Sequence, residues 1–312
     1  MRLFANARYD FIGLRRTTYI LSAAAIALGI AAALYWQITR GSWLAYGVDF
    51  TGGTLVQVRF EQPAAVGQLR ALFPDAEITR FGAEHEYLIR APQFAERGTE
   101  VARVIAARLA ERFGAGTFDI VRTEAVGPKV GGELQRKATL AVLLSFAATL
   151  IYLAFRFEWR FGVAAVIATA HDILITLALI SGLQLEVSLT TVAAVLTIVG
   201  YSLNDTIVVF DRIRENLARR AAPTFEEIVN YSVVQTLVRS LNTSLTVVFT
   251  LLALFLFGGE TIRYFVLALL IGVISGTYSS IFNASQILVV WENRELHRFL
   301  ARLRGQRQRV PA

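Results

Sequence analysis

Residues 187–210, VSLTTVAAVLTIVGYSLNDTIVVF, decide the fold of this chain, because they form a long apolar run that contains one acidic residue, Asp205. A helix needs about 20 mostly apolar residues to cross a bilayer. Five further runs of this kind occupy residues 17–36, 138–155, 161–181, 238–257 and 262–290. The sequence therefore predicts a polytopic membrane protein with six transmembrane α-helices.

The composition agrees with this prediction, since 55% of the residues are hydrophobic and only 18% are charged. A soluble domain carries about 25% charged residues. Cysteine is absent, which excludes disulfides and thiolate metal sites. The sequence also lacks a P-loop, an H-E-x-x-H helix and a G-x-S-x-G elbow, so it predicts no cofactor, no metal site and no enzyme.

The first span follows several arginines, as a signal peptide does. Its apolar region, 17–36, is longer than the roughly 7 to 15 residues of a signal peptide, and an uncleaved anchor is favoured. Basic residues near span ends gather in four segments, 1–16, 156–160, 211–220 and 291–312. The positive-inside rule then predicts that both termini are cytoplasmic, and the basic tail 291–312 is expected to contact lipid rather than nucleic acid.

The polar interval between the first two spans, residues 37–136, falls on the opposite side of the membrane. Its patterns predict strands at 54–60, 77–81, 86–90 and 117–126, with helices at 64–72 and 96–113. The order βαββαβ is that of a ferredoxin-like α+β domain. His85 falls in a turn without a second metal ligand nearby, which favours a surface histidine.

Two glycine pairs mark the ends of this domain, Gly52-Gly53 and Gly131-Gly132. Glycine permits positive φ angles and close backbone approach. Each pair is a candidate hinge between domain and membrane, and two ordinary tight turns explain the pattern equally well. Beyond it, residues 137–290 hold the remaining five spans, with a cytoplasmic helical segment near 211–237 that contains the capping-box spacing Thr224 to Glu227.

Ionisable residues inside the spans are the sharpest functional signal, because each costs about 2.5 to 3.5 kcal/mol at the centre of a helix. Asp205 shares a helix face with Tyr201 and Thr197, and Asn204 precedes it. His171 and Asp172 lie near the middle of the third span. Adjacent positions point about 100° apart on a helix, so only one of them faces any given neighbour.

Arg239 opens the fifth span and shares its face with three polar residues, Asn242, Thr243 and Thr246. Asp205 and Arg239 lie at comparable depth in antiparallel neighbours, so the two are expected to come close. A proton relay is one interpretation. The alternative is a static packing cluster, in which hydroxyl and amide groups hold the helices together.

Five motifs in their expected order carry a resemblance that covers nearly the whole chain. They are GVDFTGGT at 47–54, VGPKVGGEL at 126–134, HD at 171–172, VGYSLNDTIVVFDRIREN at 199–216 and RSLNTSLT at 239–246. The chain resembles the SecF-type members of the SecD/SecF family of protein-export membrane proteins. The resemblance implies a six-helix half of an RND-like unit in the bacterial inner membrane, with residues 37–136 in the periplasm. It also implies that SecD, on a separate chain, completes the unit.

The resemblance also implies association with the SecYEG channel and with a translocating preprotein, late in export and driven by the proton-motive force. It assigns proton transport to Asp205 and Arg239. Two other interpretations remain open on the residues alone. One is a structural subunit whose polar residues only pack, and the other is half of a small-molecule proton antiporter.

Overall fold

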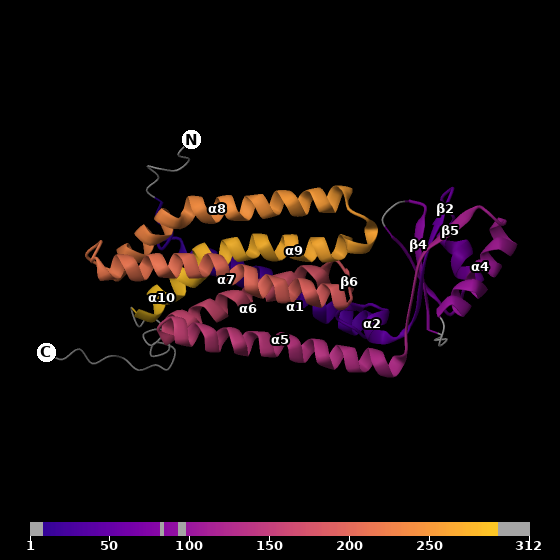
Figure 1. Ribbon diagram of the computed structural model, residues 1–312, viewed down its shortest axis with the longest axis horizontal. Coiled ribbons are helices and arrows are strands. Elements are labelled where there is room, and N and C mark those ends of the chain that lie inside the picture. Colours follow the sequence, from indigo (N-terminus) through magenta and orange to yellow (C-terminus); the bar gives the residue numbers. More distant parts are fainter. Residues whose placement is uncertain (1–8, 82–83, 93–97, 293–312) are drawn as a thin grey trace.

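The computed structural model describes residues 9–81, 84–92 and 98–292, which form a helical bundle and a β-sheet domain at one of its ends (Figure 1). Within this part of the chain, six helical stretches are long and apolar enough to cross a membrane, as predicted. They are α1 (Arg15–Arg40), α5 (Pro128–Arg156), α6 (Trp159–Gly182), α7 (Leu189–Ala218), α8 (Phe225–Phe257) and the continuous run of α9 (Glu260–Ser279), η1 (Ser280–Ala284) and α10 (Ser285–Glu292).

Three of these stretches form the centre of the bundle. The α6, α7 and α9–α10 stretches are half buried, whereas α1, α5 and α8 expose most of their surface. Small side chains allow the central helices to approach closely, as is usual in membranes. A Cβ atom at Gly276 of α9 would lie 3.2 Å from the Ser202 Cβ of α7, so a larger residue there would push the two helices apart.

The segment near 211–237 is divided between two long helices. α7 continues to Ala218, and α8 begins at Phe225 and runs without a break into the fifth span. The predicted capping box is present, since the Glu227 backbone amide donates to Thr224 Oγ1 (3.2 Å). Phe11 near the start of the described chain donates its amide to Asn230 of α8 (2.9 Å).

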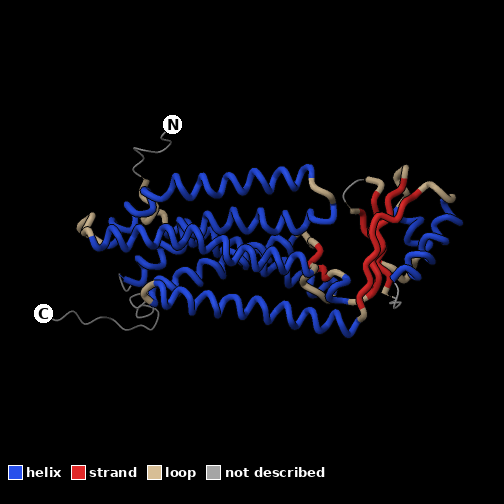
Figure 2. Tube along the Cα trace, viewed as in Figure 1, coloured by secondary structure: helices blue, strands red, loops and turns tan. Residues whose placement is uncertain are grey.

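The extramembrane domain has the predicted βαββαβ order. Its elements are β2 (Gly53–Phe60), α3 (Val66–Leu72), β3 (Glu77–Arg80), β4 (Glu86–Ala91), α4 (Gly98–Phe113) and β5 (Phe118–Val126). The antiparallel sheet has the order β3-β4-β2-β5. Val58, Ile89 and Leu109 belong to the core between the sheet and its helices. The sheet stands between α4 and the helical bundle (Figure 2).

Three short elements lie where the domain meets the bundle, and the periodicity did not predict them. β1 (Ala45–Tyr46) pairs in parallel with β6 (Glu186–Val187), which joins α6 to α7. α2 (Val48–Thr51) follows β1 directly. β1, β6 and α2 are too short to show a periodic pattern. The β1–β6 pair also forms between residues that lie far apart in sequence.

The two glycine pairs have different geometries. Gly52 and Gly53 have positive φ angles of 74° and 108°, and a Cβ at Gly53 would lie 2.6 Å from the Ala91 carbonyl oxygen. Gly131 and Gly132 lie inside α5, so the tight-turn interpretation of that pair is wrong. A Cβ at Gly131 would lie 2.8 Å from the Phe50 carbonyl oxygen. α5 therefore packs backbone to backbone against α2.

Candidate functional site

Asp205 lies on the buried side of α7 and is only 4% exposed. Ser244 of α8 donates a hydrogen bond to Asp205 Oδ2 (3.2 Å), and Thr277 of α9 donates to Ser244 Oγ (2.7 Å). We call these three residues the Asp205 cluster. Three helices thus meet at one carboxyl group that has a single hydrogen-bond donor among the described residues.

Tyr201 precedes Asp205 by one turn on the same helix, as the spacing predicts. Its hydroxyl oxygen is buried and has no hydrogen-bond partner in the described structure. Asn204, by contrast, is exposed on α7. Of the predicted polar track of α7, Tyr201 and Asp205 are at least partly buried, whereas Thr197 is exposed, as is Asn204 beside Asp205.

Arg239 is exposed on α8, and no ion pair joins it to Asp205 in the part of the chain described here. Asn242 and Thr246 are also exposed, whereas Thr243 is half-buried and donates to the Arg239 carbonyl oxygen (2.9 Å). We call Arg239, Asn242 and Thr246 the polar face of α8. These residues are exposed in this chain, and Arg239 forms no ion pair with Asp205 among the described residues.

Asp172 is fully buried on α6 and receives hydrogen bonds from three serines. Ser202 of α7 and Ser279 of α9 donate to Oδ2 (2.6 Å each), and Ser275 of α9 donates to Oδ1 (2.7 Å). His171 Nδ1 lies 3.1 Å from Oδ1. We call these five residues the Asp172 cluster.

The serines and threonines of α9 were missed by sequence reasoning. The run SGTYSS at 275–280 interrupts an apolar span, and this density of hydroxyls was the available signal. Ser275 and Ser279 contact Asp172, while Thr277 belongs to the Asp205 cluster. One face of α9 cannot be assigned to a partner helix before the packing is known, so the sequence did not connect it to the two acids.

The π-helix η1 follows Ser279 directly, and single π-helical turns are frequent at functional sites. Ser280 in η1 lies 2.9 Å from the Thr206 hydroxyl of α7. Asn283 keeps a buried Oδ1 without a partner among the described residues. The interior between α6, α7 and α9 is therefore a continuous polar layer inside an apolar bundle.

Charged groups join the domain to the bundle. Arg90 of β4 pairs with Glu186 of β6 (3.2 Å) and with Glu77 of β3 (3.0 Å). Asp49 of α2 accepts a hydrogen bond from the Leu189 backbone amide at the start of α7 (2.8 Å). Burial raises the pKa of the Glu186 carboxyl, and this effect outweighs the opposing influence of the nearby Arg90 guanidinium.

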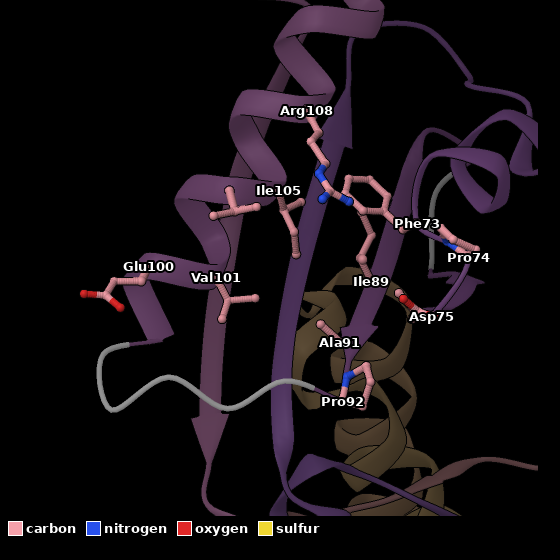
Figure 3. A pocket seen from close by; sticks show the side chains of 12 residues that line it. Phe73, Pro74, Asp75, Ile89, Ala91, Pro92, Glu100, Val101, Ile105 and Arg108 are labelled. Atoms are coloured by element: carbon pink, nitrogen blue, oxygen red, sulfur yellow. The ribbon is translucent and has the colours of Figure 1, made fainter.

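A groove of about 320 Å³ lies in the extramembrane domain (Figure 3). Apolar side chains from β4 and α4 line it, among them Ile89, Val101 and Ile105. Arg108 lies over the ring of Phe73 at one side, 6.0 Å from its centroid. The groove shares no residue with the Asp172 or Asp205 cluster, and among the described residues no group of His, Asp and Glu is arranged to bind a metal.

Comparison with known proteins identifies the family. Residues 106–294 match the model for the C-terminal region of SecD/SecF protein-export membrane proteins, and residues 42–64 match the SecD/SecF GG motif. The chain is 46% identical over 306 residues to the protein translocase subunit SecF of Gemmatimonas aurantiaca, with 94% of this chain and 90% of that protein covered. The chain belongs to the SecD/SecF family.

SecD/SecF membership makes the chain a multi-pass membrane protein and a protein-translocase subunit rather than an enzyme. It is 41% identical to the SecDF protein of Thermus thermophilus, covering 93% of this chain but 39% of that longer protein. A crystal structure of Thermus thermophilus SecDF, described as a translocon-associated membrane protein, superposes with a TM-score of 0.81 at 40% identity, covering 94% of this chain and 40% of that one.

A second SecDF crystal structure, in a form called super-membrane-facing, gives a lower TM-score of 0.67 at 38% identity. It covers 97% of this chain and 41% of that one. The homology to SecDF implies that a SecD half completes this SecF-type chain. The GG motif of the SecD/SecF family includes Gly52 and Gly53, the two glycines with positive φ angles beside β2.

Proposed function

We propose that this chain is the SecF-type subunit of an export complex that uses the proton-motive force to promote late translocation of preproteins. It pairs with SecD as a separate chain, and the complex acts at the SecYEG channel. The observation that carries the proposal is the buried carboxyl of Asp205, held between α7, α8 and α9. Moving a proton across the membrane supplies about 2.3 kcal/mol per 100 mV.

A proton site in a membrane needs a carboxyl group whose surroundings change during a cycle. Asp205 has one hydroxyl donor and no ion-pair partner among the described residues. A buried charge is costly unless it is paired. An approach of Arg239 toward Asp205 stabilises the charged form, and its withdrawal favours the proton-holding form. Movement of α8 relative to α7 therefore couples proton uptake and release to a change in helix packing.

The polar face of α8 supports the partnership with SecD. Arg239, Asn242 and Thr246 are exposed at the level of the membrane, and polar groups facing lipid are expensive. A second half-unit packed on α8 removes this cost and supplies a polar neighbour to Arg239. The proton path then lies at the boundary between the two chains.

The proton cycle moves the extramembrane domain. β1 pairs with β6 at the start of α7, and Asp49 caps the same region, so α7 is in direct contact with the domain. The distribution of basic residues supports a periplasmic position for residues 37–136 and a cytoplasmic position for both termini. A shift of α7 during the proton cycle therefore reaches the side on which the preprotein emerges.

The test uses Asp205→Asn, which keeps the size and hydrogen bonding of the side chain but removes its titratable proton. Asp211→Asn is a matched control, because Asp211 lies on the same helix but is half-exposed in a surface ion pair with Arg156. We expect both variants to assemble with SecD. Only Asp205→Asn should lose the stimulation of preprotein translocation by the proton-motive force in membrane vesicles.

Normal stimulation in an assembled Asp205→Asn complex contradicts the relay. That outcome favours the structural-subunit alternative, in which only bulky or apolar replacements of Asp205 disturb assembly. Changed drug sensitivity with intact protein export indicates the antiporter alternative instead.

A further inference from the structure

We propose that the His171–Asp172 pair is a second proton-binding site of the bundle, in which the proton binds His171 Nε2 while Asp172 remains ionised. The proposal extends the proton-driven function argued above and concerns a different group from Asp205. It rests on the geometry of the Asp172 cluster.

The hydrogen-bond partners of Asp172 suit an ionised carboxyl group. Three serine hydroxyls donate to the carboxylate oxygens, two at 2.6 Å and one at 2.7 Å. Short hydroxyl-to-carboxylate bonds of this kind are charge-assisted and strong. A carboxylate whose two oxygens accept from three hydroxyls acts only as an acceptor. Asp172 is therefore stabilised as an anion within an apolar bundle.

The acceptor-only carboxylate fixes the tautomer of His171. Nδ1 lies 3.1 Å from Asp172 Oδ1, so it carries the proton and donates to the carboxylate. Nε2 of the neutral ring is then the basic atom with a free lone pair. This atom is buried and has no partner among the described residues, and the side chain is only 10% exposed.

An unpartnered basic nitrogen beside a fixed carboxylate is suited to bind a proton. Histidine is the side chain that ordinarily changes charge near physiological pH. Proton binding forms an Nε2–H bond and converts a pair with net charge −1 into a neutral imidazolium–carboxylate pair. The serine cluster keeps the proton on the ring because it already satisfies the carboxylate oxygens.

The surroundings of His171 contain no other charged side chain in a described contact. Tyr278 of α9 is the aromatic neighbour, with 6.1 Å between ring centroids. Its hydroxyl lies 3.1 Å from Ser22 Oγ of α1. On α7 the nearest contribution to the cluster is Ser202, and Asp205 follows it by three residues. Asp172 is thus the group that determines the charge of His171.

The arrangement also connects the second site to helix packing. Asp172 belongs to α6, whereas its serine donors belong to α7 and α9. Ser279 immediately precedes η1. A change in the charge of the pair alters the strength of all three serine hydrogen bonds, and thereby the packing of α6 against α7 and α9.

The experiment is ¹⁵N NMR of histidine-labelled complex, containing this chain and SecD, in lipid bilayers over a pH range of about 5 to 8. The difference between the spectra of the unaltered complex and of His171→Gln assigns the His171 resonances. We expect a neutral ring protonated on Nδ1 at high pH that converts to imidazolium on acidification. Asp172→Asn removes the carboxylate next to Nδ1, and it should change this conversion.

A His171 ring that stays neutral over the whole range overturns the proposal, as does an unchanged titration in Asp172→Asn. The titration does not require transport, so its outcome is separate from that of the proposed function. Asp205→Asn should leave the His171 conversion in place while abolishing proton-driven export. If export survives Asp205→Asn and His171 still titrates, the proposed function fails and the second site stands.

Discussion

Ser244 Oγ of α8 lies 3.2 Å from Asp205 Oδ2 of α7 and donates the one hydrogen bond that the described structure gives this carboxyl group. Asp172, on the preceding helix α6, receives hydrogen bonds from three hydroxyl groups and has one contact with the His171 imidazole. Two buried acids of one bundle are therefore supported very differently. Asp172 has three hydroxyl donors, whereas Asp205 has one among the described residues.

Removing the donor to Asp205 should slow proton transfer. A hydrogen bond to a charged group contributes about 1.5 to 3 kcal/mol, so Ser244→Ala should reduce proton conduction by the purified complex by about tenfold or more. The matched control is Thr250→Ala, because Thr250 is exposed on the same helix and donates only to the Thr246 carbonyl oxygen in the described structure. Proton uptake into proteoliposomes measures both. Equal rates for the two variants count against a role for Ser244.

Because α5 packs closely against α2, alanine should affect protein stability differently at Gly131 and at Gly132. Gly131→Ala places a Cβ 2.8 Å from the Phe50 carbonyl oxygen, whereas a Cβ at Gly132 meets nothing within 4 Å. Overpacking of this kind costs about 1 to 3 kcal/mol, while alanine is favoured over glycine inside a helix by about 1 kcal/mol. Thermal unfolding should show Gly131→Ala as destabilised and Gly132→Ala as neutral or stabilised.

A hinge at Gly131 and Gly132 predicts a different effect of the two alanine variants on export. If the pair bends during transport, both alanine variants should reduce export to a similar degree. If Gly131 is needed only for close packing, Gly132→Ala exports normally, and the measurement distinguishes the two roles.

Acidification of the domain side should favour the docked position of the extramembrane domain. Burial raises the pKa of Glu186 above its ordinary value of 4.5 when the domain is docked. The docked state therefore binds the proton more tightly than an undocked state with Glu186 in water. Protonated Glu186 contributes fully to docking at a pH below its ordinary pKa. The contribution is lost as the pH rises through the raised pKa that Glu186 has in the docked state.

Distances between spin labels on the domain and on the bundle measure this docking as a function of pH. Glu186→Gln should remove the pH dependence and keep the domain docked, because the neutral amide carries no burial penalty for charge. The control is Glu77→Gln, since Glu77 also pairs with Arg90 but its side chain is 62% exposed. A stronger docking at high pH than at low pH in the unaltered chain contradicts this reasoning.

The polar face of α8 should lie against SecD. Because the chain has no cysteine, Asn242→Cys and Thr246→Cys each provide a single thiol for cross-linking. We expect both to form cross-links to SecD in native membranes. Leu28→Cys, on the exposed side of α1, is the lipid-facing comparison. Cross-linking that is no stronger from α8 than from Leu28→Cys places the partner elsewhere.

The sequence predicted the large elements because they have strong and regular patterns. The six spans are long apolar runs, and the strands and helices of the domain follow clear periods. It could not predict β1, β6 or α2, because elements of two to four residues carry no period. The α2–Gly131 contact is likewise a property of the folded chain.

The candidate site was predicted only in part, because several of its contacts depend on how the helices pack. Asp205, His171 and Asp172 were visible as ionisable residues within apolar runs. The serines that surround Asp172 are chemically ordinary, and their convergence depends on how α7 and α9 rotate against α6. The expected approach of Arg239 to Asp205 relied on depth alone; in the structure Arg239 is exposed on α8 and forms no ion pair with Asp205 among the described residues.

The most direct test of the central claim is proton conduction by the purified complex containing Asp205→Asn. The complex is reconstituted into liposomes, a membrane potential is imposed, and an internal pH-sensitive dye reports proton entry. Asp205→Asn should conduct no protons above the level of empty liposomes, while Asp211→Asn conducts as the unaltered complex does. Conduction by Asp205→Asn at the unaltered rate would contradict the assignment of Asp205 as the proton-carrying group.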